Sequence, residues 1–547
     1  MAKVVFVTMG EMNMGTGSIS AALKHAGHET ALVFDPSLFD EHLYFSGSSF
    51  PFNVMAKIFS QRKKVINKIA ALKPDIVAIG VISDTYQWAI AIAEGVKKRI
   101  DAPIIFGGVF PTNCPETPLG TPWVDIVCMG EGEQPMVELA DSLDRGKIDT
   151  SIGNLVFKTD DGQESGLVRN PVRPLQDLNE LQPDDMGLFE DDIHIGNRYY
   201  IHASKGCIIS CSFCSQAFYE EFNGTRDPRR RSPDLVIDEL LEAKKRYDIR
   251  LIDFEDNVFY SNHAWFREFA EKYKEKINIP YICMGHPLPM NDEVARLLSE
   301  SGCYRLQLGI QSMNEENRKK HLYRPETNEQ IRACFDSLDK YGVKYSCDHI
   351  FGLPDENNEE NLYNAAWEYS KCEQVHKVNT FFLTCYPKTP MVKKAIEWGM
   401  IKPEDEDKIN QGHSNFYYDY GITTDTKLKR LFRAYAIFYR IMPALPKKAR
   451  FFILEKNLVK LLAFLPKTLT MFFIDLFLTF RNSDPVSRHV MGTYLLWLRR
   501  ILFDGGVRIR EGEPPLKTVK ILTAKAEKGS EGSGKLVASH QVTKAAP

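Results

Sequence analysis

Short runs rich in valine and isoleucine alternate with amphipathic stretches along the first 150 residues. Apolar runs at 3–7, 30–34, 75–81, 103–108 and 124–130 are predicted strands, and the segments near 18–27, 55–72, 86–99 and 133–145 are predicted helices. Strands dominated by these side chains are typical of parallel sheets covered by helices on both faces. Residues 1–150 are therefore predicted to form a doubly wound, Rossmann-like α/β domain that binds ligands at the carboxyl ends of its strands.

A second alternation of strands and helices begins near residue 198. Its apolar runs are RYYIHAS, IRLIDFED, IPYICMG, YRLQLGI, KYSCDHIFG and VNTFFLTCYP. This order predicts an α/β barrel over residues 196–395. The acidic and proline-rich residues 151–195 are interpreted as a linker with a small hairpin. Residues 396–523 are predicted to be helical, and the polar tail 524–547 is predicted to be disordered.

Length, net charge and cysteine content limit the classes of protein to which this chain can belong. A chain of 547 residues is too long for one core. A formal net charge of −3 gives no general case for nucleic-acid binding. Eleven unevenly spaced cysteines argue against a disulfide framework, and the N-terminus lacks the features of a signal peptide. We therefore expect a cytoplasmic protein whose thiols are free to bind metal.

Three cysteines form the strongest chemical signal. Cys207, Cys211 and Cys214 lie within the string SKGCIISCSFCSQ, on a loop after a predicted strand. Three soft thiolates within eight residues suit a [4Fe–4S] cluster and leave one of its four irons open. The alternatives are a zinc site or buried free thiols. Zinc usually takes a fourth Cys or His at fixed spacing, and the nearby His202 lies on the preceding strand.

This CxxxCxxC spacing resembles that of the radical S-adenosylmethionine (radical SAM) superfamily, with Phe213 in the family's aromatic position. The resemblance implies that S-adenosylmethionine binds the open iron and is cleaved reductively to a 5′-deoxyadenosyl radical. It also implies an electron donor such as flavodoxin or ferredoxin.

Further positions at predicted strand ends resemble the family's S-adenosylmethionine contacts. The resemblance implies three acceptors for the methionyl ammonium group, two polar residues that face the ribose, a partner for the methionyl carboxylate, and a glycine beside the adenine. The ammonium acceptors are Glu255, Asp256 and Asn257, and the ribose-facing residues are Gln311 and Ser312. The carboxylate partner is Arg324, and the glycine beside the adenine is Gly352. The glycines that usually accompany the ammonium site are absent here. Helix caps and surface charges are the alternative interpretation of these positions.

Three strings of the N-terminal domain resemble the cobalamin-binding domain of B12-binding radical SAM proteins. They are LKHAGHETALVFD, FGGVFPTNCPE and VDIVCMGEGE, and with the barrel the resemblance covers about 390 residues. Gly107 and Gly108 end a strand where a flat corrin ring can approach the backbone closely. Gly130 and Gly132 precede a helix whose N-terminus can receive polar groups.

The cobalamin resemblance departs from one pattern. The DxHxxG motif that supplies a histidine below cobalt is absent, and His28 is not expected to be a cobalt ligand. A domain that binds nothing, or a plain nucleotide-binding Rossmann domain, remains the alternative. The glycines of MGEMNMGTGS are not spaced as GxGxxG, which weakens the nucleotide alternative.

Residues 450–480 form the most apolar segment. Its uncharged runs are broken at Lys456, Lys460, Lys467 and Asp475 and are too short to span a membrane. Two interpretations remain: helices that pack over the barrel mouth, or a basic amphipathic element at a membrane surface. A hydrophobic small-molecule substrate suits either.

Three functions compete. The first is a cobalamin-dependent methyltransferase that acts on an unactivated carbon. The second is an oxidative cyclase resembling anaerobic magnesium-protoporphyrin ester cyclase, and the third is a non-catalytic iron–sulfur protein. The ordered strand-end positions favour the first two.

Overall fold

Five parallel strands form the centre of the N-terminal unit, as predicted. In the computed structural model, which describes residues 1–10, 12–38, 52–158, 166–356, 358–413, 425–482 and 484–511, they lie in the order β2-β1-β3-β4-β5. Their bounds are β1 (Lys3–Met9), β2 (Glu29–Asp35), β3 (Ile76–Gly80), β4 (Ile104–Gly107) and β5 (Ile126–Cys128). Nearly every residue of β1 and β2 is buried, because helices cover both faces of the sheet.

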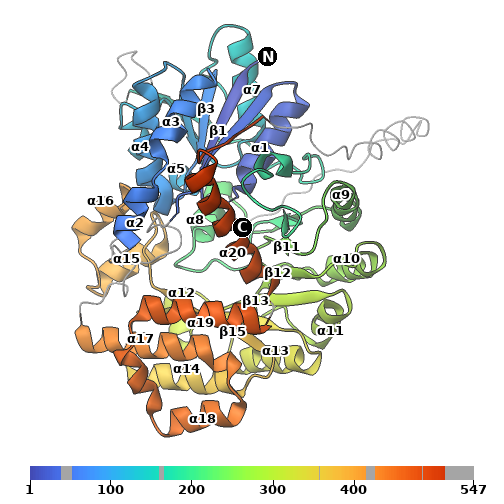
Figure 1. Ribbon diagram of the computed structural model, residues 1–547, viewed down its shortest axis with the longest axis vertical. Helices are drawn as coiled ribbons and strands as arrows, with labels where there is room; N and C mark the ends of the chain where they lie inside the picture. Colours follow the sequence, from blue (N-terminus) through green and yellow to red (C-terminus); the bar gives the residue numbers. More distant parts are fainter. Residues whose placement is uncertain are drawn as a thin grey trace, which may run out of the picture.

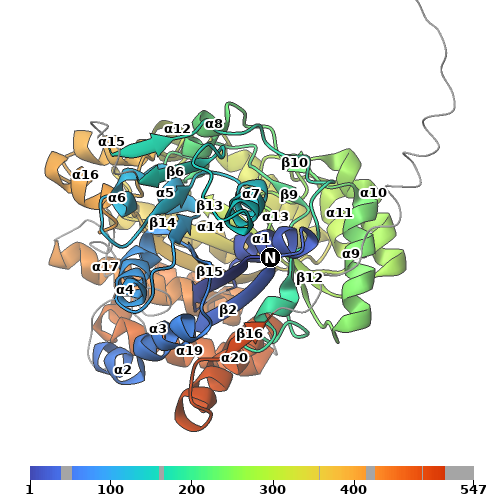
Figure 2. The same ribbon diagram turned by 90° about the horizontal axis from the view of Figure 1, so that it is seen from above.

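Helices lie on both faces of this sheet (Figures 1 and 2), and alternate side chains of the strands pack into two separate cores. Val4 and Phe6 belong to the core with α1 (Met14–His25) and α7 (Glu133–Asp144). Val5 and Val7 belong to the core on the opposite face, with α3 (Arg62–Ala71) and α4 (Tyr86–Lys97). The remaining helices of this unit are α2 (Phe52–Phe59), η1 (Ser83–Thr85), α5 (Val109–Asn113) and α6 (Glu116–Leu119).

The helix predicted over 55–72 is two helices, α2 and α3. The chain breaks at Gln61, whose side-chain amide donates to the carbonyl of Phe59 at 2.8 Å. A side chain that bonds nearby backbone competes with the helical ladder, and the sequence pattern does not reveal this.

The edges of this sheet hold strands that were not predicted to join it. β6 (Leu155–Lys158) and β7 (Leu167–Arg169) form the hairpin expected within the linker, and β6 pairs antiparallel with β5. At the other edge β16 (Ile509–Glu511), in the region predicted to be helical, pairs antiparallel with β2. The sheet order is β16-β2-β1-β3-β4-β5-β6-β7.

Six parallel strands form the second sheet, in the order β15-β14-β13-β12-β11-β8. They are β8 (Tyr199–Ile201), β11 (Ile252–Phe254), β12 (Tyr281–Gly285), β13 (Cys303–Gln311), β14 (Tyr345–Phe351) and β15 (Val375–Phe382). The connecting helices are α9 (Pro233–Arg246), α10 (His263–Lys276), α11 (Asp292–Glu300), α12 (Glu315–Leu322), α13 (Asn328–Lys340) and α14 (Glu359–Lys371). The two outer strands do not pair with each other in this sheet, so the barrel is partial.

Short elements after β8 carry the cysteine loop. β9 (Ser204–Lys205) pairs antiparallel with β10 (Arg229–Arg230), and α8 (Gln216–Asn223) lies between them in the chain. The 3-10 helix η2 (Met186–Phe189) belongs to the segment between the two units.

The C-terminal region is mainly helical, as predicted, and packs on the open side of the barrel (Figure 1). Phe432 of α17 stacks on Phe351 of β14 with ring centroids 5.2 Å apart. Its elements are α15 (Pro390–Glu397), α16 (Pro403–Asn410), α17 (Thr426–Ile441), η4 (Met442–Ala444), α18 (Lys447–Glu455), η5 (Leu458–Phe464), α19 (Lys467–Asn482) and α20 (Pro485–Phe503). No helix in the described part of the chain is long and apolar enough to cross a membrane. The predicted tail, 524–547, lies outside the described residues.

Candidate active site

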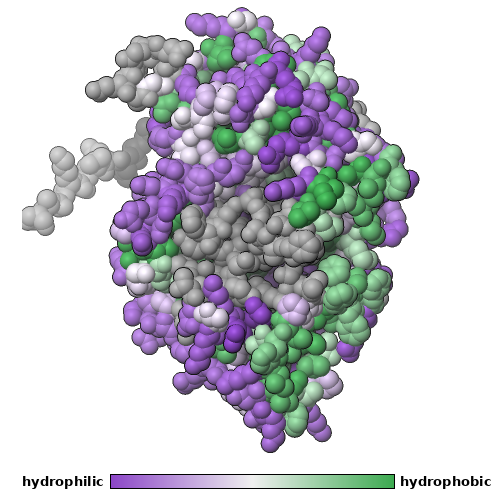
Figure 3. All heavy atoms as spheres, turned by 60° about the vertical axis from the view of Figure 1, so that its left-hand side comes forward, coloured by the Kyte–Doolittle hydropathy of each residue, from purple (hydrophilic) through white to green (hydrophobic). Residues whose placement is uncertain are grey.

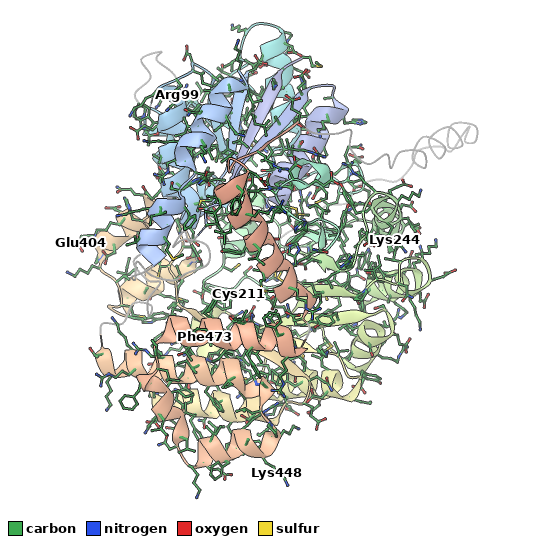
Figure 4. The ribbon with its side chains drawn as sticks, in the orientation of Figure 1. Arg99, Cys211, Lys244, Glu404, Lys448 and Phe473 are labelled. Carbon is green, nitrogen blue, oxygen red and sulfur yellow. The ribbon has the colours of Figure 1, made fainter. Side chains whose placement is uncertain are left out.

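The loop that carries the three predicted cluster ligands is held by buried backbone contacts. Ser212, which is fully buried between the cysteines, donates its hydroxyl to the carbonyl of His321 at 2.6 Å and its N–H to that of Leu322 at 3.1 Å. Its own carbonyl accepts from the N–H of Met391 at 2.9 Å. The loop is therefore fixed to α12 and α15, which holds its thiols in place (Figure 4).

Burial raises the pKa of all three thiols, that of Cys211 to about 11. The guanidinium of Arg324 acts in the opposite direction, because its Nη1 lies 3.6 Å from the Sγ of Cys211. A thiol must lose its proton to bind iron, so the nearby positive charge favours the form that binds.

The donor set fits a cluster better than a single ion. Within the described residues, no group of three or more His, Cys, Asp or Glu side chains is placed to hold one metal ion. In a [4Fe–4S] cluster each cysteine binds a different iron, so the thiols need not converge on one point. Three free, partly or fully buried thiols on a fixed loop satisfy that requirement.

A cavity of about 450 Å³ lies between the two units and is lined by both; we name it the interdomain cavity. The barrel contributes Cys207, Glu255 and Asn257, among others. The N-terminal unit contributes the ends of its strands and the loops after them. This is where the doubly wound fold was predicted to bind a ligand.

All four predicted glycines of the N-terminal unit line the interdomain cavity: Gly107, Gly108, Gly130 and Gly132. Gly108 has a φ of +99°, and a Cβ there would lie 2.9 Å from the carbonyl oxygen of Val81. Gly130 also has a positive φ, +71°, and a Cβ at Gly132 would meet the side chain of Ile19 at 2.9 Å. Gly108 and Gly130 thus adopt backbone conformations that favour glycine, and a Cβ at Gly107 would make only ordinary contacts, the nearest at 3.8 Å. Since all four residues lack side chains, backbone forms this wall and a broad, flat ligand can lie close to it.

Ion pairs join the two units at the rim of the cavity. The ammonium of Lys205, two residues before Cys207, lies 3.0 Å from the Glu133 carboxylate and 3.8 Å from that of Glu131. Arg229 forms a second ion pair with Glu131. Burial opposes the charged form of Glu133, but Lys205 and the Ser18 hydroxyl outweigh it and lower its pKa.

The structure separates the three residues predicted to receive the methionyl ammonium group. Glu255 and Asn257 line the interdomain cavity, and Asn257 donates to the carbonyl of Gly206 at 2.9 Å. Asp256 is fully buried, and its carboxylate accepts from the N–H of Ala203 at 3.1 Å and from the hydroxyl of Ser204. Asp256 therefore braces β9 instead of facing the cavity.

Neither residue of the predicted ribose-facing pair, Gln311 and Ser312, lines the interdomain cavity. Gln311 lies at a bulge between β13 and β14 with a φ of +67°. Ser312 is fully buried, and its hydroxyl donates to Glu356. Gly352 has a φ of +83°, and an added Cβ there would meet no atom within 4 Å.

Arg324 and Phe213 have protein partners. Arg324 contacts the Cys211 sulfur, donates its Nε to Glu326 at 2.7 Å, and bonds the carbonyl of Gly309. The guanidinium of Arg324 therefore faces the cluster loop and is already hydrogen-bonded to protein atoms. Phe213 packs against the apolar cluster of α15 and the end of β14.

Several residues that shape the site were not singled out from the sequence. Lys205 and Ser212 lie inside the cysteine string, and their charge and small size were the available signals. His202, considered from the sequence only as a zinc ligand, also lines the cavity, and burial together with the nearby Lys205 and Arg231 lowers its pKa to about 4. His28 is buried and accepts from the N–H of Ala2 at 3.3 Å, consistent with a structural role.

Comparison with known proteins matches two family models to this chain. The B12 binding domain matches residues 8–140, and the Radical SAM superfamily matches residues 201–365. The chain belongs to the B12-binding radical SAM proteins. The predicted family and fold class are thus confirmed.

Curated relatives of this B12-binding radical SAM protein include two kinds of enzyme. An uncharacterized methyltransferase of Pyrococcus horikoshii is 28% identical over 349 residues, which cover 62% of this chain and 72% of the relative. The anaerobic magnesium-protoporphyrin IX monomethyl ester cyclase of Rubrivivax gelatinosus is 27% identical over 56% of each chain.

Solved structures share the fold of this B12-binding radical SAM protein. The cobalamin-dependent S-adenosylmethionine radical enzyme OxsB with aqua-cobalamin bound gives a TM-score of 0.61 at 15% identity, over 92% of this chain and 80% of that one. The radical S-adenosylmethionine methyltransferase TsrM of Kitasatospora setae, with cobalamin and a [4Fe-4S] cluster bound, gives 0.55 at 17% identity, over 73% and 75%.

Proposed function

We propose that this protein is a cobalamin-dependent radical SAM methyltransferase that acts on an unactivated carbon of a small molecule. The observation that carries the proposal is one cavity lined on one side by the cysteine loop and on the other by glycine-rich strand ends. When bound, the cluster and S-adenosylmethionine supply the 5′-deoxyadenosyl radical, and the corrinoid supplies the methyl group. A flavodoxin- or ferredoxin-like protein delivers the electrons.

The chain's own residues have distinct tasks in this proposal. Cys207, Cys211 and Cys214 hold the cluster, while Glu255 and Asn257 offer acceptors to the bound S-adenosylmethionine. The glycine wall lets the corrin ring lie against backbone. The ion pairs of Lys205 and Arg229 with Glu131 and Glu133 hold the two units together, which keeps water from a reactive radical.

The relatives support methyl transfer and also define the alternative. The Pyrococcus relative is named a methyltransferase and the Rubrivivax relative a cyclase, at nearly equal identity. Methyl transfer is the proposal because the glycine wall, where a corrinoid would supply the methyl group, lines the same cavity as Cys207 of the cluster loop.

The test uses anaerobically reconstituted protein, S-adenosylmethionine labelled in its methyl group, and extracts that supply candidate substrates. We expect 5′-deoxyadenosine together with a labelled product, and no labelled product from protein reconstituted without corrinoid. Formation of 5′-deoxyadenosine with an unlabelled, dehydrogenated or cyclised product indicates the cyclase. Absence of any S-adenosylmethionine cleavage indicates the non-catalytic iron–sulfur protein.

We further propose that no histidine from the N-terminal unit coordinates cobalt. The loop after β1 presents Met12, Asn13 and Met14 to the cavities in place of a DxHxxG histidine. Electron paramagnetic resonance of the Co(II) form should therefore lack splitting from a coordinated nitrogen. Clear splitting that persists when the cofactor lacks its own base would contradict this assignment.

We also propose that the protein binds a membrane surface through its C-terminal helices. Four phenylalanines of α19 are at least half exposed: Phe472, Phe473, Phe477 and Phe480. Exposed Leu461, Phe464, Leu502 and Phe503 lie on neighbouring elements. Figure 3 shows hydrophobic side chains gathered along one side of the molecule, and Figure 4 marks Phe473 on α19. A patch of this kind marks an interaction site more often than a solvated cap.

Liposome flotation tests the membrane proposal. The double variant Phe473→Ser/Phe477→Ser should remain at the bottom of the gradient, while the wild type floats. Ile58→Ser on α2 is the matched control, because Ile58 is more exposed, at 70%, than Phe473 and Phe477, at 62% and 59%, but lies on a different element. Wild-type protein that stays at the bottom removes the proposal.

A further inference from the structure

We propose that a second cavity, walled by helix α20, is the substrate site, and that its substrate is a neutral, largely apolar molecule with a few hydrogen-bonding atoms. The inference rests on the proposed function. This α20 cavity has a volume of about 720 Å³ and lies between α20, the first strand of the N-terminal unit and the first strand of the barrel. In Figure 1, α20 runs from the N-terminal unit down to the barrel.

Three buried polar atoms on the lining have no hydrogen-bond partner among the described residues. They are the Oγ1 of Thr8, the Nδ1 of His489 and the Oγ1 of Thr493. These residues are 3%, 5% and 6% exposed. Buried polar groups are nearly always satisfied in folded proteins, so three unsatisfied ones around one cavity indicate a ligand that bonds them.

The polar atoms of α20 lie on one helical face. His489, Thr493 and Trp497 follow each other at intervals of four residues, so they point the same way. Burial and the nearby Arg198 lower the pKa of His489 to about 4, so its ring is neutral and offers one donor and one acceptor. Together with Thr493, it can recognise a carbonyl, a hydroxyl or a ring nitrogen.

Much of the remaining lining is apolar or aromatic. It includes three methionines and four large aromatic side chains: Met9, Met12, Met14, Trp88, Tyr200, Tyr494 and Trp497. Its other polar residues include Asn13, Thr85, His202 and Glu255, and the carboxylate of Glu255 disfavours an anionic ligand. The cation on the lining, Arg198, is paired with Asp253, with Nε and Oδ2 2.7 Å apart. No unpaired cation of the described lining faces the cavity, so a phosphate-bearing substrate would bury its charge without a partner.

The α20 cavity adjoins the interdomain cavity. Both are lined by His202 and Glu255 of the barrel and by Asn13, Gly80 and Val109 of the N-terminal unit. A molecule in the α20 cavity therefore lies beside the cofactors. Ile82 and Val490 also line the cavity and are 43% and 38% exposed, so its opening is apolar.

Helix α20 is anchored firmly enough to serve as a wall. The indole Nε1 of Trp497 donates to the carbonyl of Asp192 at 2.8 Å, and Arg500 pairs with the Asp192 carboxylate. Its N-cap, Asp484, accepts from the N–H of Ser487 at 3.0 Å. The unsatisfied atoms are thus presented from a fixed surface, which lowers the entropic cost of binding.

The experiment measures fluorescence of N-phenyl-1-naphthylamine, a neutral molecule in which one N–H joins a naphthalene and a phenyl ring, on the reconstituted full-length protein. Anilinonaphthalene sulfonate, with the same rings and a negative charge, is the comparison. We expect the neutral probe to bind about tenfold more tightly and to suppress labelled methyl transfer in extracts. Thr493→Trp, which fills the cavity, should reduce its affinity at least about tenfold, and the isosteric Thr493→Val roughly threefold.

Leu495→Trp is the matched control, because Leu495 is 58% exposed on the opposite side of α20. It should leave probe affinity unchanged. Equal affinity in wild type, Thr493→Trp and Thr493→Val overturns the inference. So does a loss of bound corrinoid in Thr493→Trp, since the cavity then belongs to that cofactor. Failure of the proposed function is separate: the probe still binds as expected, but S-adenosylmethionine is not cleaved.

Discussion

The two α/β units line the same cavity, but they line it with different chemical groups. The N-terminal unit offers backbone, through four glycines at which a side chain is excluded or would approach a neighbour. The barrel offers side chains, among them the Cys207 thiol, the Glu255 carboxylate and the Asn257 amide. A wall of backbone suits a large flat ligand recognised by shape, whereas convergent side chains suit a metal cluster and a polar ligand recognised by chemistry.

This contrast predicts an order for the effects of substitutions on the two sides of the cavity. Substitutions on the barrel side should abolish S-adenosylmethionine cleavage, whereas substitutions on the glycine side should weaken corrinoid binding. A result in the reverse order would break the comparison.

The largest effect is expected at the cluster. Cys211→Ala should reduce iron from about four per chain to well below that and abolish S-adenosylmethionine cleavage, because two thiolates cannot hold the cluster. Iron analysis and 5′-deoxyadenosine assays measure this. Cys114→Ala, at a buried cysteine of the N-terminal unit, should retain both. Full iron in Cys211→Ala would show that other cysteines supply the ligands.

Arg324→Gln is expected to rank next. It removes a buried charge that Glu326 and the Cys211 sulfur face, and it leaves the buried Glu326 with Arg318, 3.8 Å away, in place of its nearer partner at 2.7 Å. The free energy of unfolding should fall by about 3–5 kcal/mol, and the cluster should become harder to reduce because a nearby positive charge is lost. Arg332→Gln, whose partner Glu368 is nearer the surface, should cost less than about 1 kcal/mol. Spectroelectrochemistry separates the two effects, since a purely structural Arg324 would leave the potential unchanged.

Gly108→Ala tests the glycine wall. The new Cβ would lie 2.9 Å from backbone at a φ of +99°, which should cost about 1–3 kcal/mol and reduce bound corrinoid without affecting iron. Gly27→Ala has a similar φ of +92° but open space around the new Cβ, and it lies away from the cavity. If both variants bind corrinoid equally well, close backbone approach at Gly108 is not required.

The smallest effect is expected at the joint between the units. Glu133→Gln should lower stability at neutral pH by about 1–2 kcal/mol, because it removes the ion pair with Lys205 while retaining a polar group for Ser18. The pKa of Glu133 is lowered in the folded state, so its contribution is present above the usual glutamate range and is lost as pH falls through the folded pKa. Urea unfolding of both proteins at neutral and acidic pH should show the difference shrinking on acidification. Glu94→Gln, at an exposed ion pair, should show little difference at either pH.

Strand existence was predictable here, whereas side-chain direction at strand ends was not. All eleven predicted strands are present, because valine-rich runs and the β/α order specify them. Among Glu255, Asp256 and Asn257, however, the middle residue points away from the cavity, and Ser312 likewise points to Glu356. Where a strand gives way to a loop, alternation ends, so consecutive polar residues cannot be sorted by spacing alone.

Long-range pairings could not be predicted from the sequence either. Nothing in residues 485–511 indicates that α20 walls a cavity or that β16 joins the first sheet, because these depend on contacts hundreds of residues apart. The glycines of the N-terminal unit were predictable as lining residues, and Gly108 and Gly130 occupy a local conformation that favours glycine.

The pairing of β16 with β2 has a consequence for synthesis of the chain. Residues 509–511 complete the edge of a sheet whose first strand is residues 3–9, and Lys3 pairs with Glu511 at 3.3 Å. While the ribosome is still translating the barrel, the edge of β2 has no partner and is a template for pairing with another chain. The first unit to emerge is therefore among the last to be completed, and a nascent chain stalled before residue 509 would expose that edge.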